Sequence, residues 1–201
     1  MMKQLRLGFM SSHGGSNMQA ILDAVSDGRL NAWPAVLISN NSTSTAMERA
    51  RTFGMPAYHY SSVTHPEPEI LDLQILETLK RHEIDYLMLV GYMKRLGPAT
   101  LDAYAGRIIN IHPSLLPKHG GHGMYGRHVH EAVLRSGERQ TGVTIHLVDG
   151  EYDTGAIISQ CTVPVEDNDT VDSLSARVLK REHEFLVETL IRIANQAITI
   201  G

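Results

Sequence analysis

The sequence predicts an α/β protein with a doubly wound, mostly parallel sheet. Up to about residue 111, short apolar runs alternate with longer segments whose apolar residues recur at helical spacing. That alternation is typical of parallel strands joined by right-handed helical crossovers, with helices on both faces of the sheet. Later in the chain two β runs follow each other with only an acidic turn between them. These late strands are expected to extend the sheet antiparallel or to carry the substrate site.

Local signals justify the elements of the first half. Residues 45–53 form a short helix that Gly54 stops, and residues 69–82 carry isoleucine or leucine at every third position from Ile70 to Leu79. Residues 86–90 are continuously apolar and end at Gly91, as in a strand buried on both faces. In chain order we expect strand 5–10, helix 17–28, strand 35–39, helix 45–53, strand 56–60, helix 69–82, strand 86–90, helix 98–104 and strand 107–111.

The second half opens with a glycine-rich loop at 118–126. It leads into elements that we expect at helix 127–136, β runs 141–148 and 156–165, and a terminal helix 171–195.

Composition narrows the class of protein. The chain has 201 residues, which suggests one domain. A net charge of −4 without a basic stripe argues against a nucleic-acid partner. No window approaches the ~20 apolar residues of a membrane span, and residues 1–10 are too short and polar for a signal peptide. We therefore expect a cytoplasmic protein, monomer or homodimer, with small-molecule substrates and no membrane or nucleic-acid partner.

The single cysteine, Cys161, excludes an internal disulfide and fits a reducing compartment. We expect it to be a small buried residue of the last β run rather than a nucleophile. The reason is that no cation or helix start that would stabilise a thiolate is evident beside it.

Open α/β sheets bind ligands outside the carboxyl ends of their strands. This rule predicts the functional site at four segments: 11–17, 91–96, 110–117 and 148–155.

The segment 11–17 joins the first strand to the first helix. Its glycines permit a tight turn, and free amides at a helix start can bind one phosphate. No Gly-Lys-Ser/Thr follows, so the segment is not a triphosphate loop. A capped helix start, with Ser16 or Asn17 as N-cap, explains the same residues equally well.

Asn110 and His112 are two residues apart at a strand end, so their side chains face one space. An asparagine amide can donate to a developing oxyanion, and a histidine can donate a proton or stabilise charge. In the acidic turn 149–155, a carboxylate near the histidine would raise its pKa and relay a proton through water. The alternatives are that Asn110 and His112 have only a structural role at the strand end, and that the acidic turn is a solvated hairpin end.

A metal site is not expected, although the chain has 11 histidines. The sequence contains no His-Glu-x-x-His pattern, and its only cysteine is distant from the histidine-rich segment. His128 and His130 are two apart, so they diverge on the predicted helix.

The segment 110–117, Asn-Ile-His-Pro-Ser-Leu-Leu-Pro, resembles the folate-dependent formyltransferases, most closely those that act on phosphoribosylglycinamide. Co-linear matches run through the loop from Ser12, the helix 45–53, the segment 91–96, the turn at Asp153 and the terminal helix at Glu182. The resemblance implies a Rossmann-like fold over one domain, 1–201. Its N-terminal half would bind phosphate, and its C-terminal half would bind folate and carry the catalytic residues.

The resemblance also implies site residues and a reaction. The implied activity is transfer of the formyl group of 10-formyltetrahydrofolate, the co-substrate, to the amine of 5'-phosphoribosylglycinamide, with no metal. The implied catalytic residues are Asn110, His112 and Asp153, with His112 protonated. The implied substrate-binding residues are Gly15, Ser16 and Asn17 at the phosphate and Glu182 near the glycinamide. The implied folate-binding residues are Met93, Lys94, Arg95, Leu96, Val148 and Asp149.

Two departures from the family and three alternatives remain. The loop 119–126 is longer and richer in glycine than the usual family loop, and Lys94 stands where the family has an arginine. The alternatives are a formyltransferase acting on another amine, a 10-formyltetrahydrofolate hydrolase, and a non-catalytic binding module. The chain is acidic, unlike a tRNA-binding enzyme, and a binding module would not need Asn110, His112 and Asp153 together.

Overall fold

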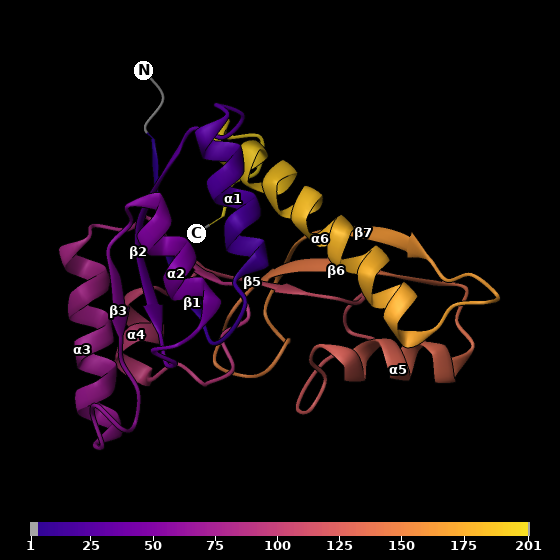
Figure 1. Ribbon diagram of the computed structural model, residues 1–201, viewed down its shortest axis with the longest axis horizontal. Helices are drawn as coiled ribbons and strands as arrows, with labels where there is room; N and C mark the ends of the chain where they lie inside the picture. The colour runs from indigo at the N-terminus through magenta and orange to yellow at the C-terminus, as the bar shows by residue number, and fades with distance from the viewer. Residues whose placement is uncertain (1–3, 201) are drawn as a thin grey trace.

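The computed structural model describes residues 4–200 (Figure 1). The first three residues, which belong to the segment judged unlike a signal peptide, lie outside the described residues, as does Gly201. The strands are β1 (Leu5–Ser11), β2 (Ala32–Ser39), β3 (Ala57–His59), β4 (Tyr86–Leu89), β5 (Ile108–His112), β6 (Gln140–Leu147) and β7 (Ile157–Pro164). The helices are α1 (Ser16–Ser26), α2 (Thr45–Phe53), α3 (Pro68–Arg81), α4 (Pro98–Ala103), α5 (Arg127–Ser136) and α6 (Val171–Ala194).

The strands form one sheet in the order β3-β2-β1-β4-β5-β6-β7. The pairs from β3 to β5 are parallel, whereas β5–β6 and β6–β7 are antiparallel. Chain order reverses between β1 and β4, which leaves a crevice at the carboxyl ends of these strands. The predicted fold class, doubly wound and parallel with an antiparallel extension, is confirmed.

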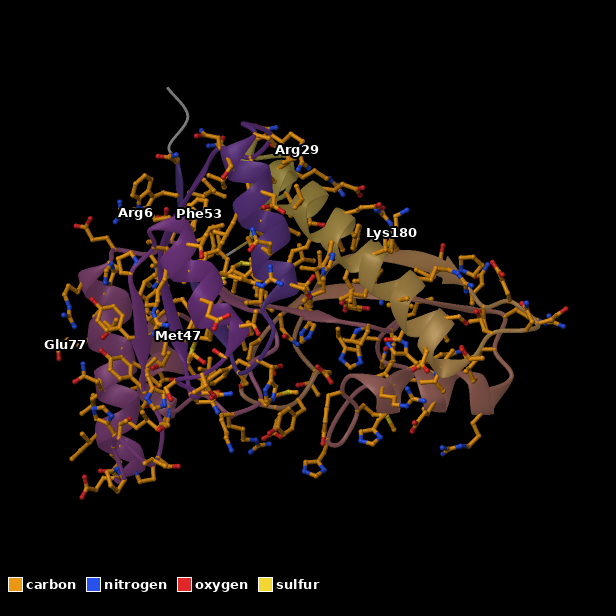
Figure 2. All side chains as sticks on the ribbon, in the orientation of Figure 1. Arg6, Arg29, Met47, Phe53, Glu77 and Lys180 are labelled. Atoms are coloured by element: carbon orange, nitrogen blue, oxygen red, sulfur yellow. The ribbon has the colours of Figure 1, made fainter. Side chains whose placement is uncertain are left out.

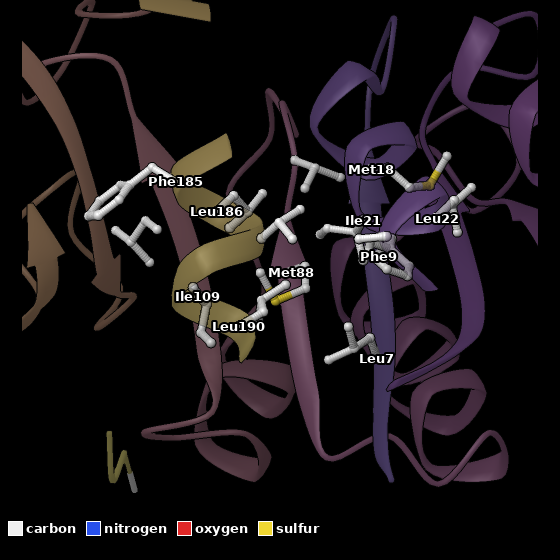
Figure 3. Packing of buried hydrophobic residues seen from close by; sticks show 14 of the residues in the cluster. Leu7, Phe9, Met18, Ile21, Leu22, Met88, Ile109, Phe185, Leu186 and Leu190 are labelled. Atoms are coloured by element: carbon white, nitrogen blue, oxygen red, sulfur yellow. The ribbon is translucent and has the colours of Figure 1, made fainter. Parts of the chain in front are cut away.

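Two hydrophobic clusters cover the two faces of the sheet. Alternate strand residues such as Phe9 and Met88 pack against α1, α2, α5 and α6, and α1 and α6 lie side by side (Figures 1 and 3). The opposite strand residues, such as Met10 and Ile108, pack against α3 and α4. Polar side chains such as Glu77 on α3 and Lys180 on α6 point away from the sheet (Figure 2).

Strand β5 places its side chains on these two faces in alternation. Ile109 belongs to the cluster beneath α5 and α6, and Ile108 belongs to the cluster beneath α3 and α4. Side chains two apart share a face of a strand. Asn110 and His112 therefore lie on the α3–α4 face, where the loops after β5 and β6 cover the sheet.

Most element boundaries lie within one or two residues of their predicted positions, and the differences at α1 and β2 have identifiable causes. Helix α1 begins at Ser16, with Gly15 as its N-cap and no side-chain cap, so the expectation that Ser16 or Asn17 caps it is wrong. Strand β2 begins at Ala32, three residues earlier than expected. It contains Pro34, which cannot donate to a ladder, and the β1–β2 register shifts beside it, between Leu7 and Gly8.

Candidate active site

Four polar side chains meet on the α3–α4 face of the sheet. Asn110 and His112 come from β5, His146 lies directly opposite Asn110 on β6, and Asp153 comes from the loop after β6. The Asp153 carboxylate lies 3.5 Å from His112 Nδ1 through one oxygen and 3.5 Å from His146 Nε2 through the other. The structure thus brings together the three residues predicted to act in catalysis, and it adds His146.

His146 orients the amide of Asn110. Its Nδ1 lies 2.8 Å from the carbonyl oxygen of Leu147, so Nδ1 carries the proton of the neutral ring and donates it there. Nε2 is then an acceptor, and it lies 3.1 Å from Asn110 Nδ2. One amide N–H of Asn110 therefore donates to His146, and the second is left to donate to another acceptor.

His112 is buried, and each of its ring nitrogens faces an oxygen. Its Nε2–H donates to the carbonyl oxygen of His119 at 2.8 Å, which leaves Nδ1 facing Asp153. Burial lowers the pKa of His112 below its ordinary value, and the Asp153 carboxylate, which raises it, offsets burial only in part. The Asp153 carboxylate thus acts on the pKa of His112 with the predicted sign, although burial outweighs its contribution.

Asp153 is the centre of the group. Burial opposes its ionisation. Interactions with His146 and His112, which favour the carboxylate when the ring nitrogen that faces it is protonated, and the N–H of Gly121, which donates to Oδ2 at 2.9 Å, outweigh burial and lower the pKa of Asp153. The carboxylate is therefore ionised at neutral pH.

A cavity of about 90 Å³ opens next to this group. Asn110, His146 and Asp153 line it, whereas His112 reaches it through Asp153. Of the six residues predicted to bind folate, four line the cavity: Lys94, Arg95, Leu96 and Val148. The other two lie beside it. The N–H of Met93 donates to Ser12 Oγ at 2.8 Å, and the Asp149 carboxylate accepts from Thr154 Oγ1 at 2.9 Å.

Two walls of the cavity touch at its mouth. Arg95 forms a 3.0 Å ion pair with Glu151, and its guanidinium lies 4.8 Å from the ring centroid of Tyr152. Both members of the ion pair are exposed, and such pairs contribute little to stability. A cavity of this size is smaller than ligand pockets, which usually measure roughly 300 Å³ or more.

The predicted phosphate loop lies at the start of α1. Gly15 has a φ of 64°, and a Cβ there would lie 2.8 Å from the Cβ of Ala46, so only glycine fits. Ser16 and Asn17 are the first two residues of an uncapped helix, whose N–H groups are available to an anion. Ser12 joins this loop to the cavity wall by accepting from the N–H of Met93.

Glu182 lies on α6 beside the phosphate loop. It accepts a 3.4 Å hydrogen bond from Asn17 Nδ2 and is buried. Burial raises the pKa of Glu182 to about 7, and the Asn17 bond opposes this only weakly. The structure thus places together two residues that the resemblance assigns to the same substrate.

The loop after β6 reaches the site by an unexpected route. Because β6 is antiparallel, it ends opposite Ile109 near the start of β5 rather than at the carboxyl ends of the parallel strands. The segment 148–153 must therefore run back along the sheet to bring Asp153 to His112, the last residue of β5. The rule that ligands bind at the carboxyl ends of parallel strands predicted the segment 148–155 correctly. The rule does not apply to this segment, however, because β6 is antiparallel.

The two histidines at the start of α5 point in different directions. His130 is buried and His128 is exposed, so the two diverge as predicted.

Cys161 is half-buried in β7, and burial raises the pKa of its thiol. Arg181 lies beside that thiol, so the expectation that no cation stands near it is wrong. The sequence alone could not show that Arg181 of α6 lies beside Cys161 of β7, because this contact depends on how the helix packs on the sheet. Within residues 4–200 there is no cluster of three or more His, Cys, Asp or Glu placed to hold a metal ion.

No helix within the described part of the chain is long and apolar enough to cross a membrane.

The comparisons with known proteins point in one direction. A family model described as formyl transferase matches residues 5–190. The chloroplastic phosphoribosylglycinamide formyltransferase of Vigna unguiculata is 39% identical over 196 residues, which are 98% of this chain and 63% of that protein. The phosphoribosylglycinamide formyltransferase of Bacillus subtilis is 31% identical over 194 residues, 95% of this chain and 97% of that protein.

Solved structures agree with this similarity. The crystal structure of glycinamide ribonucleotide transformylase 1 from Symbiobacterium toebii matches with a TM-score of 0.90 at 35% identity, over 98% of this chain and 91% of that one. The chain spans less than two thirds of the Vigna unguiculata relative but nearly all of the bacterial ones.

Proposed function

This chain belongs to the formyl transferase family, and we propose that it transfers the formyl group of 10-formyltetrahydrofolate to the amine of 5'-phosphoribosylglycinamide, a step of purine synthesis. One observation carries the proposal to the level of residues. Asn110 and Asp153, with His112 beside Asp153, line a cavity together with Lys94–Leu96 and Val148.

The reaction needs one bond made, one broken and one proton moved. The neutral amine attacks the formyl carbon and forms the new C–N bond, and the formyl oxygen becomes an oxyanion. The bond from the formyl carbon to N10 of the folate then breaks. The attacking nitrogen loses one proton, and N10 gains one, so no covalent enzyme intermediate is required.

The side chains of the site fit these demands. The amide N–H of Asn110 that does not bind His146 donates to the oxyanion, where a preorganised donor is most effective. The ionised Asp153 positions a water that accepts the proton of the amine. It also favours the imidazolium of His112 as that proton moves, which adds positive charge near the oxyanion. His112 is therefore neutral at rest and charged only during the reaction.

The remaining assignments complete the proposal. Gly15, Ser16 and Asn17 bind the substrate phosphate at the uncapped start of α1, and Glu182 lies near the glycinamide end. The chain is one domain, 1–201, with the phosphate site in its N-terminal half and the folate site and catalytic residues in its C-terminal half. Met93 and Asp149 contribute to the folate wall alongside the four residues that line the cavity. The protein works as a cytoplasmic monomer or homodimer.

A simple assay tests the proposal. The protein is mixed with 10-formyltetrahydrofolate, and the deformylated folate is followed with and without 5'-phosphoribosylglycinamide. We expect turnover only with the amine. Turnover that is independent of the amine would replace the transferase with a hydrolase, and turnover only with a different amine would change the acceptor.

A further inference from the structure

The glycine-rich loop after β5 contacts the catalytic group through its backbone. The carbonyl oxygen of His119 accepts from His112 Nε2 at 2.8 Å, and the N–H of Gly121 donates to Asp153 Oδ2 at 2.9 Å. Two peptide groups only two residues apart therefore hold the two residues that we assign to proton transfer. These two hydrogen bonds position His112 and Asp153 only if other contacts hold the loop itself in place.

The loop approaches the group closely. A Cβ at Gly120 would lie 2.3 Å from the side chain of Leu116, which is buried, and 3.3 Å from the Cβ of Asp153. His119 has a φ of 53°, in the left-handed region that residues other than glycine rarely adopt. Such a backbone conformation persists only where the surrounding structure holds it.

The side chain of His119 is tied to the segment between α5 and β6. Its Nε2 lies 2.9 Å from an oxygen of Glu138, and both side chains are largely shielded from solvent. Glu138 also accepts from Ser136 Oγ at 3.3 Å and pairs with Lys118 Nζ at 3.2 Å. The hydrogen bond from His119 is the largest influence that lowers the pKa of Glu138, so the acceptor is an ionised carboxylate.

We propose that His119 and Glu138 are positioning residues for formyl transfer: their hydrogen bond anchors the loop so that its backbone fixes the orientation of His112 and Asp153. This inference rests on the proposed function and extends it to a pair that touches neither substrate. Its chemical consequence is the choice of tautomer. The His119 carbonyl can accept only from a protonated Nε2, so Nδ1 is the nitrogen that faces Asp153 and takes up the proton.

Three substitutions distinguish the effect of the His119–Glu138 hydrogen bond from the effects of backbone strain and of neighbouring charges. His119→Gly removes the side chain at a position whose φ glycine adopts freely, so a defect cannot come from backbone strain. His119→Gln retains a side-chain N–H that can donate to Glu138. Lys118→Met is the matched control, because it removes the exposed ammonium group that also pairs with Glu138.

Each variant is measured in two ways. Steady-state kinetics give kcat and the KM of both substrates, and nitrogen-15 NMR of the imidazoles gives the tautomer of His112 without any substrate. For His119→Gly we expect kcat to fall about tenfold, the loss typical of one hydrogen bond, with both KM values within about twofold of wild type. His112 should then populate both neutral tautomers, whereas in the wild type Nε2–H dominates. His119→Gln should recover kcat to within about threefold, and Lys118→Met should resemble the wild type.

The proposal is overturned if His119→Gly keeps the wild-type kcat and tautomer, or if His119→Gln loses as much as His119→Gly. It is also overturned if kcat falls while the His112 tautomer is unchanged. If His119→Gly does not fold, Glu138→Met, which removes the acceptor and keeps a side chain of similar length, is judged by the same two readouts. Because the NMR measurement needs no turnover, failure of this anchor can be distinguished from failure of the proposed reaction.

Discussion

The Nε2 atom of His146 lies 3.1 Å from the Nδ2 atom of Asn110, across the antiparallel pair β5–β6. Because His146 donates its Nδ1 proton to the Leu147 carbonyl, its Nε2 accepts, and the amide of Asn110 must present its NH₂ group rather than its oxygen. A histidine opposite the oxyanion donor thus fixes which end of that donor faces the reacting atoms.

Replacing His146 with phenylalanine removes this acceptor but keeps a ring. We expect kcat to fall about fivefold, since one net hydrogen bond contributes about 1 kcal/mol to the orientation of Asn110. The KM of each substrate should change little. Steady-state kinetics check this, and the exposed His128→Phe is the matched control. Wild-type kcat in His146→Phe would show that Asn110 needs no such partner.

Removing the charge of Asp153 should shift the titration of His112 to lower pH. The pKa of His112 already lies below its ordinary value because of burial, and the Asp153 carboxylate is what raises it. Without that negative charge the imidazolium is less favoured, so the pKa falls further. An NMR titration of His112 in Asp153→Asn checks the direction. Asp149→Asn, in the same loop but bonded to Thr154, should leave His112 unchanged. An upward shift in Asp153→Asn would contradict the account.

Glu182 should make stability depend on pH. Its pKa rises from 4.5 in the unfolded chain to about 7 in the fold, so folding favours the protonated form. This contribution is complete below pH 4.5 and is lost as pH rises through about 7. The shift corresponds to a loss of about 3 kcal/mol. Glu182→Gln stays neutral and should not lose it.

Urea unfolding from pH 4.5 to above pH 7 measures this difference between the wild type and Glu182→Gln. Glu184→Gln, an exposed neighbour on α6, serves as the control and should follow the wild type. Parallel curves for the wild type and Glu182→Gln would mean that Glu182 is ionised in the fold throughout.

Gly15→Ala should damage the phosphate loop. The substitution forces a left-handed residue and places a Cβ against Ala46, which together should cost about 1–2 kcal/mol of stability or more. The KM of the phosphorylated substrate should rise, while that of the folate should not. Gly14→Ala is the matched control, since nothing lies within 4 Å of its added Cβ. If both substitutions changed the KM of the phosphorylated substrate equally, phosphate binding would not depend on the left-handed turn at Gly15.

The fold could be predicted largely from the sequence, because hydrophobic periodicity reports local structure directly. Every expected helix and strand is present, including the two antiparallel strands. The boundary errors at α1 and β2 have local causes. A glycine replaced the expected side-chain cap, and a proline was tolerated inside a strand beside an irregular register.

The candidate site could be predicted only where its residues belong to one motif. Asn110 and His112 share a strand, so their common orientation follows from its period of two. His146 does not, because its place opposite Asn110 depends on the β5–β6 register, which no single segment determines. The one available signal was the alternation of the polar Thr144 and His146 with the apolar Val143, Ile145 and Leu147. The direction in which the pKa of His112 shifts could not be predicted from the sequence either, because it depends on burial of the ring.

The most direct test of the account follows the formyl carbon itself. The protein is given 10-formyltetrahydrofolate with an isotopically labelled formyl group, together with 5'-phosphoribosylglycinamide, and the labelled products are identified by mass spectrometry. We expect one labelled N-formyl product to form for each folate consumed. We also expect Asn110→Ala, though folded, to form that product about 100- to 1,000-fold more slowly. Labelled formate in place of the N-formyl product, or an Asn110→Ala variant as fast as the wild type, would contradict the account.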